Sequence, residues 1–209
     1  MPRTIFGAML ICLTLNALAA DESVFGTHWV KFQPVQVAGD LQGCQLTFWT
    51  VTADRTYLDG DRVAVNGSIV LGAIDRGLGL MLKVGLKNMT SLSAFEKPAF
   101  AYLQTATAST AKSQQRSSDG EPGYKLFVYS VADKDTMNVL MELMTSGKAS
   151  IGYNRKIGGI DVLVPLDLMV ADSEYTQNQK VIRTMSPETT KGFAECTDKI
   201  INRVLDKLK

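Results

Sequence analysis

The chain has 209 residues, of which 22 are Lys or Arg and 21 are Asp or Glu, and 45% are hydrophobic. This length suits one domain with a sizeable core, and the ordinary composition excludes a disordered or collagen-like chain. Because basic and acidic residues nearly balance, we expect neither a nucleic acid nor an anionic membrane surface as partner.

The first residues are typical of a cleaved secretory signal peptide, which we place at residues 1–19. Arg3 supplies a positive charge, an apolar run follows, and Ala17-Leu18-Ala19 has the small-residue pattern of a cleavage site. The apolar run is shorter than the ~20 residues that a spanning helix needs. We therefore expect a periplasmic protein in which residues 20–209 form a single β-rich domain.

The first half of the mature chain reads mainly as strands. Residues 27–32 predict a short strand, and residues 44–52, which alternate apolar and polar side chains, predict a second one. Asp59-Gly60-Asp61 indicates a turn. Residues 62–71 predict the next strand, and we interpret Asn66-Gly67 within it as a bulge or second turn.

The next segments predict two strands followed by a loop. Residues 80–86 and 99–105 have strand patterns. Residues 105–123 are rich in Thr, Ala, Ser and Gln and lack apolar periodicity, which predicts a long exposed loop. Because residues 124–131 form a further predicted strand, we expect this loop to join its two flanking strands as a hairpin.

A helix is predicted from Asp133 or Asp135, either of which can cap its start, to Gly147. Its residues at helical spacing are Met137, Leu140, Met141 and Met144. We predict that this methionine stripe packs in the core, and the alternative is a promiscuous binding groove.

Two more strands are predicted over residues 148–155 and 160–170, with a hairpin at Lys156-Ile157-Gly158-Gly159. Pro165 lacks an N–H and therefore places the second of these strands at a sheet edge. Residues 172–180 are polar and are expected to be exposed.

Ser186-Pro187-Glu188 predicts the start of the last helix, because it supplies a cap, a proline at the first helical position and an acid in the first turn. Its apolar face carries Phe193, Cys196, Ile200, Val204 and Leu208. Cys12 would leave with the signal peptide, so Cys44 and Cys196 remain, and an even count in an oxidising compartment predicts one disulfide between them. Such a bridge would stabilise the fold by roughly 4–5 kcal/mol in the chain-entropy model.

Together these elements predict a mainly β fold of the α+β type. It comprises an antiparallel β-sandwich or partly closed barrel of about eight strands, with one internal helix and a C-terminal amphipathic helix.

Catalytic signals are weak throughout. His28 is the single histidine of the chain, which excludes a zinc site built on several histidines and predicts a packed or surface residue in place of a general base. Ser109-Thr110-Ala111-Lys112 matches the S-x-x-K pattern, but the companion motifs are missing. Asp59-Gly60-Asp61 lacks the further ligands of a calcium loop. We predict no catalytic residue, metal site or cofactor.

Four segments of the C-terminal half form a recognisable series, namely Leu143–Gly147, the Gly158-Gly159 hairpin, Val164–Leu168 and Gly192-Phe193 with Cys196 after it. In these segments the chain resembles the invasion-associated locus B family of bacterial periplasmic proteins. More than twenty residues separate the third and fourth of these segments here, whereas they are nearly contiguous in the family, and the additional cysteines of the family are absent. The resemblance implies a small exported β-rich protein without known catalysis.

Three functions stay open at this point. The leading hypothesis is a non-enzymatic periplasmic protein of a Gram-negative bacterium that binds another envelope protein or secretion-system component, as an accessory or inhibitor-like partner. The first alternative is a protein that binds a small apolar ligand inside its barrel or sandwich. The second alternative is a hydrolase that uses a pair of carboxylates distant in sequence.

Overall fold

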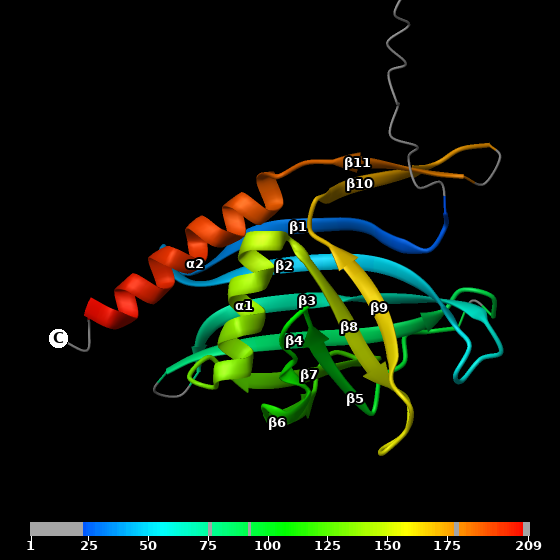
Figure 1. The fold of residues 1–209 in the computed structure, drawn as a ribbon, viewed down its shortest axis with the longest axis horizontal. Helices are drawn as coiled ribbons and strands as arrows, with labels where there is room; N and C mark the ends of the chain where they lie inside the picture. Colours follow the sequence, from blue (N-terminus) through cyan, green and yellow to red (C-terminus); the bar gives the residue numbers. More distant parts are fainter. Residues whose placement is uncertain (1–22, 75–76, 92, 178–179, 207–209) are drawn as a thin grey trace, which may run out of the picture.

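A computed structural model of the chain describes residues 23–74, 77–91, 93–177 and 180–206 (Figure 1). The predicted signal peptide lies outside these residues. The described part is mostly β, with eleven strands in antiparallel sheets and two α-helices.

The largest layer is an antiparallel sheet of six strands, whose long members β1 to β4 run side by side in Figure 1. In spatial order its strands are β1 (Gly26–Val37), β2 (Asp40–Asp54), β3 (Asp61–Ile74), β4 (Gly77–Asn88), β7 (Tyr124–Ser130) and β6 (Gln114–Asp119). Consecutive strands β1 to β4 are neighbours because each is joined to the next by a short connection, as expected for a meander.

The other elements are shorter and pack on or beside this sheet. A three-stranded antiparallel sheet contains β5 (Phe100–Gln104), β8 (Lys148–Asn154) and β9 (Val162–Asp167). A two-stranded hairpin contains β10 (Val170–Tyr175) and β11 (Val181–Met185). The helices are the single 3₁₀ turn η1 (Thr110–Lys112) and the α-helices α1 (Lys134–Ser146) and α2 (Glu188–Asp206).

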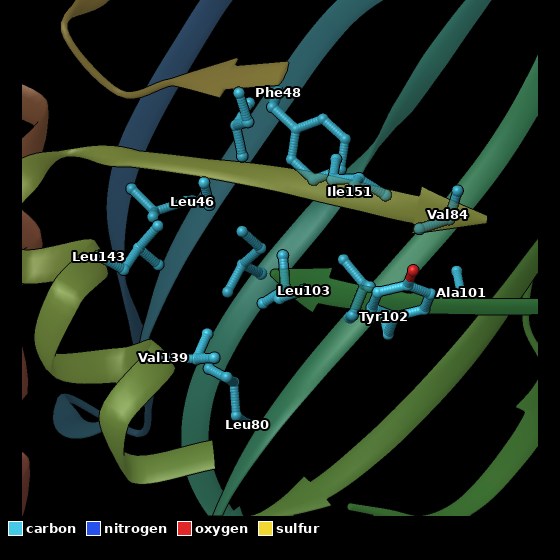
Figure 2. Close-up of a cluster of buried hydrophobic side chains, with 14 of the residues drawn as sticks. Leu46, Phe48, Leu80, Val84, Ala101, Tyr102, Leu103, Val139, Leu143 and Ile151 are labelled. Carbon is cyan, nitrogen blue, oxygen red and sulfur yellow. The ribbon is translucent and has the colours of Figure 1, made fainter. Parts of the chain in front are cut away.

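The core lies between the six-stranded sheet and a second layer made of the small sheet and the two α-helices (Figure 1). Figure 2 shows how side chains of the two layers meet in the core. From the large sheet come Leu46, Phe48, Leu80 and Val84, and from the second layer Ala101, Tyr102, Leu103, Val139, Leu143 and Ile151. Alternate residues of each long strand are buried here, which is the strand periodicity that the sequence showed.

The structure confirms the predicted fold class, since antiparallel sheets pack face to face with an internal and a C-terminal helix. The large sheet is not closed into a barrel. The strand count was too low, because β6, β10 and β11 were not predicted. Pro165 does lie in β9, an edge strand of the small sheet, as expected from its missing N–H.

The prediction that residues 105–123 form an exposed loop joining two paired strands is wrong. These residues contain η1 and β6, and β6 pairs with β7 at the end of the large sheet. The preceding strand β5 pairs with β8 instead. Thr110 is fully buried, and its hydroxyl accepts a hydrogen bond of 3.0 Å from the backbone N–H of Leu103. Backbone pairing holds β6, whose side chains are mostly exposed, so it has no apolar period.

The interpretation of Asn66-Gly67 as a bulge or turn is also wrong, because β3 pairs with β2 and β4 in an unbroken register through both residues. A β-carbon at Gly67 would collide with the backbone carbonyl of Lys83 and press on the ring of Phe48. The glycine is therefore explained by a close approach within the sheet.

Helix α1 begins and ends where its sequence predicts. The Asp133 side chain accepts hydrogen bonds from the backbone N–H groups of Asp135 and Thr136, and the helix ends at Gly147 with a φ of 67°. The methionine stripe is core only in part. Met137 and Met144 pack against the core, whereas Met141 is 47% exposed.

Helix α2 lies along β1 and β2 and joins the second layer to the first (Figure 1). Phe193, Cys196 and Ile200 are buried beneath it, as predicted, while Leu208 lies outside the described residues. Cys44 of β2 and Cys196 have disulfide geometry, with Cα atoms 5.8 Å apart. The two cysteines thus meet across 152 residues of sequence.

Candidate functional site

The six-stranded sheet has a second side that faces away from the helices and the small sheet. Along β1 to β4 and β7, the residues between the buried core positions point to this side, which we call the outer face. The strand register groups its residues into rows that cross the sheet from β1 to β7. Two neighbouring rows carry Trp29, Trp49 and Tyr124 together with the basic residues Lys31 and Lys83.

The first of these is the aromatic row. Trp29 is paired with Trp49, Trp49 with Asn66, Asn66 with Gly85, and Gly85 with Tyr124. The tryptophans are the two that the chain contains. Because Gly85 has no side chain, the ring of Tyr124 lies over it, where a β-carbon would come within 2.7 Å of the ring.

Tyr124 is held in place across two strands. Its hydroxyl donates a hydrogen bond of 2.8 Å to Asn66 Oδ1, and Asn66 Nδ2 donates one of 2.8 Å to the carbonyl of Phe48. Burial, and then the negative charge of Glu121, raise the pKa of Tyr124, so its hydroxyl remains a donor at neutral pH. Phe95 completes the cluster, with its ring 5.1 Å from that of Tyr124 and 6.1 Å from that of Trp49.

The second row lies beside the aromatic row, two residues further along each strand. It runs from Lys31 through Thr47 and Ser68 to Lys83, which are paired in that order. Lys31 is exposed, Thr47 and Lys83 are partly exposed, and Ser68 is buried between them. We call this the lysine–hydroxyl row, because it has a cation at each end and a hydroxyl within reach of solvent between them.

The charged residues at the strand positions of the outer face are all basic. They are Lys31, Arg62, Lys83 and Lys87, and Lys83 also pairs with Glu121 of the β6–β7 turn. No Asp or Glu occupies an outward position of β1 to β4, β6 or β7, all of which the structure describes. The near-zero net charge of the whole chain therefore conceals a basic face.

Three lysines of this face lie over aromatic rings, at distances where a cation is attracted to the ring electrons. The Nζ atom is 5.5 Å from the ring centre for Lys31 over Trp29 and 5.3 Å for Lys83 over Tyr124. Lys87 lies 5.8 Å over Phe95. These contacts fix the long lysine side chains against the sheet, which lowers the entropy cost of ordering them on a partner.

A hollow of about 510 Å³ lies beyond Tyr124 and Phe95, at the turn between β6 and β7. The acidic residues that line it are each paired with a cation. Glu121 lies 3.2 Å from Lys83, Asp119 2.6 Å from Lys97, and Glu96 2.9 Å from Arg155. The Lys97 ammonium lowers the pKa of Asp119 by donating a hydrogen bond to its carboxylate. These pairs reduce the repulsion that the hollow would exert on an anion at the outer face.

The residues singled out for chemistry lie elsewhere and are not brought together. Ser109 caps η1, where its Oγ accepts a hydrogen bond from Ala111, so this serine has a local structural role. Asp59-Gly60-Asp61 lies in the connection between β2 and β3. Among the described residues, no group of three or more His, Cys, Asp or Glu side chains is placed to hold a metal ion.

Asp54 is fully buried, and its carboxylate is surrounded by other polar groups. Its oxygens accept hydrogen bonds from the Tyr57 backbone N–H, the Tyr153 hydroxyl and Arg155 Nε, at 2.9, 3.0 and 3.1 Å. Arg155 also pairs with Glu96. These contacts fasten the β2–β3 connection to β8, which is a structural use of the carboxylate.

His28 is 3% exposed and fastens the β10–β11 hairpin to β1. Its Nε2 lies 2.9 Å from the Val24 carbonyl and its Nδ1 2.9 Å from Ser173 Oγ, while its ring stacks on Tyr175 at 5.5 Å. The carbonyl contact requires a proton on Nε2, so Nδ1 accepts from the serine. Of the two expected placements, packed or on the surface, the structure shows the packed one.

Acid is expected to loosen the β10–β11 hairpin. Burial lowers the pKa of His28 below its ordinary value, so the neutral ring is the form that the fold favours. Its contribution to stability is complete above the ordinary pKa of about 6.5 and is lost as the pH falls through the lower folded value. The protection factors of the β10 and β11 amides, which compare their exchange with the intrinsic chemical rate, should therefore fall between neutral and acidic pH.

The matched control for this measurement is His28→Phe, which keeps an aromatic ring and removes the titrating group. Exchange in the hairpin of this variant should no longer depend on pH beyond the intrinsic chemical rate. An equal fall of the protection factors in the wild type and the variant would contradict the role given to His28.

No protein-family model, curated protein or solved structure matches the chain. The resemblance to the invasion-associated locus B family therefore stays a prediction. Within the described residues, no helix has the length and apolar character needed to cross a membrane.

Sequence reasoning missed the outer face. Its residues come from five strands, and none of them forms a motif along the chain. The available signal was the alternation of side chains within each predicted strand. Because Phe48 and Leu82 point to the core, the adjacent residues Trp49 and Lys83 point to the other side of the sheet.

Proposed function

We propose that this protein is a non-enzymatic, exported binding protein of the bacterial cell envelope, and that it holds another envelope component on its outer face. The observation that carries the proposal is the combination of both tryptophans with basic residues, and no acidic ones, at the outward strand positions. Aromatic side chains supply large contact areas at small entropic cost, and a one-sided charge selects an acidic partner.

Export is supported by the signal-peptide pattern and by the Cys44–Cys196 pair, which suits an oxidising compartment. The basic face further suggests that the envelope component is acidic. The interior offers less support for a small apolar ligand, because core side chains from both layers fill the space between them (Figure 2).

The proposal predicts that binding depends on the charge of the outer face. The tagged mature protein is incubated with a crosslinked envelope extract, and bound material is compared between wild type and the double variant Lys31→Glu/Lys83→Glu. We expect the variant to lose the captured component, since two attractions become repulsions. Lys148→Glu is the matched control, because Lys148 is exposed at the start of β8 in the opposite layer.

Circular dichroism and thermal unfolding establish that each variant is folded before the comparison is made. Equal capture by the wild type and the double variant would contradict the assignment of binding to this face. Loss of capture in the Lys148→Glu control would also contradict it, because a general charge effect would then explain the result.

A further inference from the structure

The residues of the outer face indicate the chemical class of its partner, in addition to the sign of its charge. This inference rests on the binding function proposed above. The aromatic row and the lysine–hydroxyl row run parallel to each other across the strands, one pair of residues apart. Positions i and i+2 of a strand are roughly 7 Å apart. A linear partner that lies across the strands therefore contacts both rows along its whole length.

The two rows offer different chemistry to such a partner. The aromatic row presents the apolar rings of Trp29 and Trp49, which are partly exposed. The lysine–hydroxyl row presents Lys31 and Lys83, separated by three strand spacings or about 14 Å, with the Thr47 hydroxyl between them. In the adjoining row on the other side of it, Gln33 and Gln45 add side-chain amides, joined by a hydrogen bond of 3.1 Å.

We infer that the outer face binds an acidic glycan that runs across the strands from β1 to β4. The C–H faces of its sugar rings contact Trp29 and Trp49, and its hydroxyl groups exchange hydrogen bonds with Thr47 and the glutamine amides. Its carboxylates pair with Lys31 and with Lys83, which gives up its ion pair with Glu121 to bind the ligand. Of the common acidic polymers, an acidic glycan is the one that combines apolar ring faces, many hydroxyl groups and spaced negative charges.

The spacing of the cations favours a glycan over a single-stranded nucleic acid. A nucleic acid carries a phosphate on every nucleotide and is bound by grooves that follow this backbone with basic residues. Here the two lysines of the lysine–hydroxyl row stand at its ends, and the residues between them are neutral.

The depth of the aromatic rings favours a glycan over a lipid bilayer. Binding to a bilayer buries protruding apolar side chains in the acyl region. The tryptophans and Tyr124 are instead partly buried, with Tyr124 seated on Gly85. Rings that protrude so little suit a ligand that lies against the sheet.

Tryptophan fluorescence tests this inference directly, because the two tryptophans of the chain both lie in the aromatic row. The purified mature protein is titrated at low ionic strength with oligogalacturonic acid, and in parallel with a neutral galactan oligosaccharide of the same length. We expect a saturable change with the acidic sugar, and about tenfold weaker binding of the neutral one, the effect of losing two partly exposed ion pairs.

The variant Lys31→Ala/Lys83→Ala should lower the affinity for the acidic sugar by the same factor, whereas Lys148→Ala should leave it unchanged. Raising the salt concentration should weaken the binding of the acidic sugar and leave that of the neutral one nearly unaffected. An equal loss in the Lys148→Ala control would overturn the inference, since it would show attraction by overall charge.

Parallel titrations with oligothymidylate and with vesicles containing phosphatidylglycerol test the other occupants. Tighter binding of either one than of the acidic sugar would overturn the inference. So would the absence of binding to either sugar. If the envelope capture still depended on Lys31 and Lys83 in that last case, the proposed binding function would stand and the glycan assignment alone would fail.

Discussion

The double variant Cys44→Ser/Cys196→Ser is expected to lose about 5 kcal/mol of its free energy of unfolding, which is the chain-entropy value for so long a loop. The bridge closes 152 residues of sequence and joins β2 to helix α2. Cys44 is fully buried and Cys196 is 5% exposed, so the serines also place two hydroxyl groups in the core. Urea unfolding, followed by circular dichroism, measures the difference.

The remaining contacts of α2 determine how much structure this variant keeps. The Thr189 hydroxyl donates a hydrogen bond of 3.2 Å to the Val30 carbonyl, and Arg203 donates one of 2.6 Å to the Leu41 carbonyl. Both ends of the helix therefore keep an anchor on the sheet. We expect a variant that still folds at low temperature and whose α2 amides exchange faster than those of the sheet.

The control is the wild-type protein with and without reductant. Reduced wild type should unfold at nearly the same urea concentration as the double variant. Without reductant, the unfolded mature protein should react with no thiol reagent at Cys44 or Cys196. Labelling of both cysteines under those conditions would show that the predicted disulfide does not form.

Asp54→Ala is expected to cost about 3–5 kcal/mol, because it breaks a buried ion pair by removing one partner. The carboxylate is fully buried, and Arg155, which donates to it over 3.1 Å, has 15% of its side chain exposed. The Tyr153 hydroxyl loses an acceptor at 3.0 Å at the same time. Burial and the Asp54 charge raise the pKa of Tyr153, so this hydroxyl stays a donor throughout the accessible pH range.

Asp54→Asn should lose less than Asp54→Ala, since the amide keeps the shape and one acceptor oxygen. Asp59→Asn in the same connection is the matched control and should change stability by less than about 0.5 kcal/mol, because Asp59 is exposed. Thermal unfolding of the three variants orders them. Equal stability of Asp54→Ala and Asp59→Asn would contradict the role given to the buried cluster.

The sequence predicted the strands that have one buried face, and it missed those that do not. In β2 and β4 every second residue enters the core, so their alternation was readable. In β6 five of the six residues are exposed, and the strand forms only because β7 offers an unpaired edge. Strands β10 and β11 likewise bury only one residue each, and contacts such as that of His28 with Ser173 hold them. Pairing partners of this kind are tertiary information.

The candidate site was less predictable than the fold, for a related reason. Trp29, Trp49 and Lys83 become neighbours only through the register of four strands, and a one-residue shift would send each of them to the other side of the sheet. The net charge of the chain gave no sign of the basic residues on the outer face, because acidic residues at other positions balance them. The net charge of a chain does not report the local charge of the face that binds a partner.

Photocrosslinking in living cells tests the central claim, that the outer face is where the envelope component binds. A photoreactive amino acid replaces Gln45 on the outer face in one strain and Leu163, which is 49% exposed on β9 of the opposite layer, in another. We predict that irradiation yields a discrete crosslinked product from position 45 only. A product from position 163 with none from position 45 would contradict the assignment of function to this face.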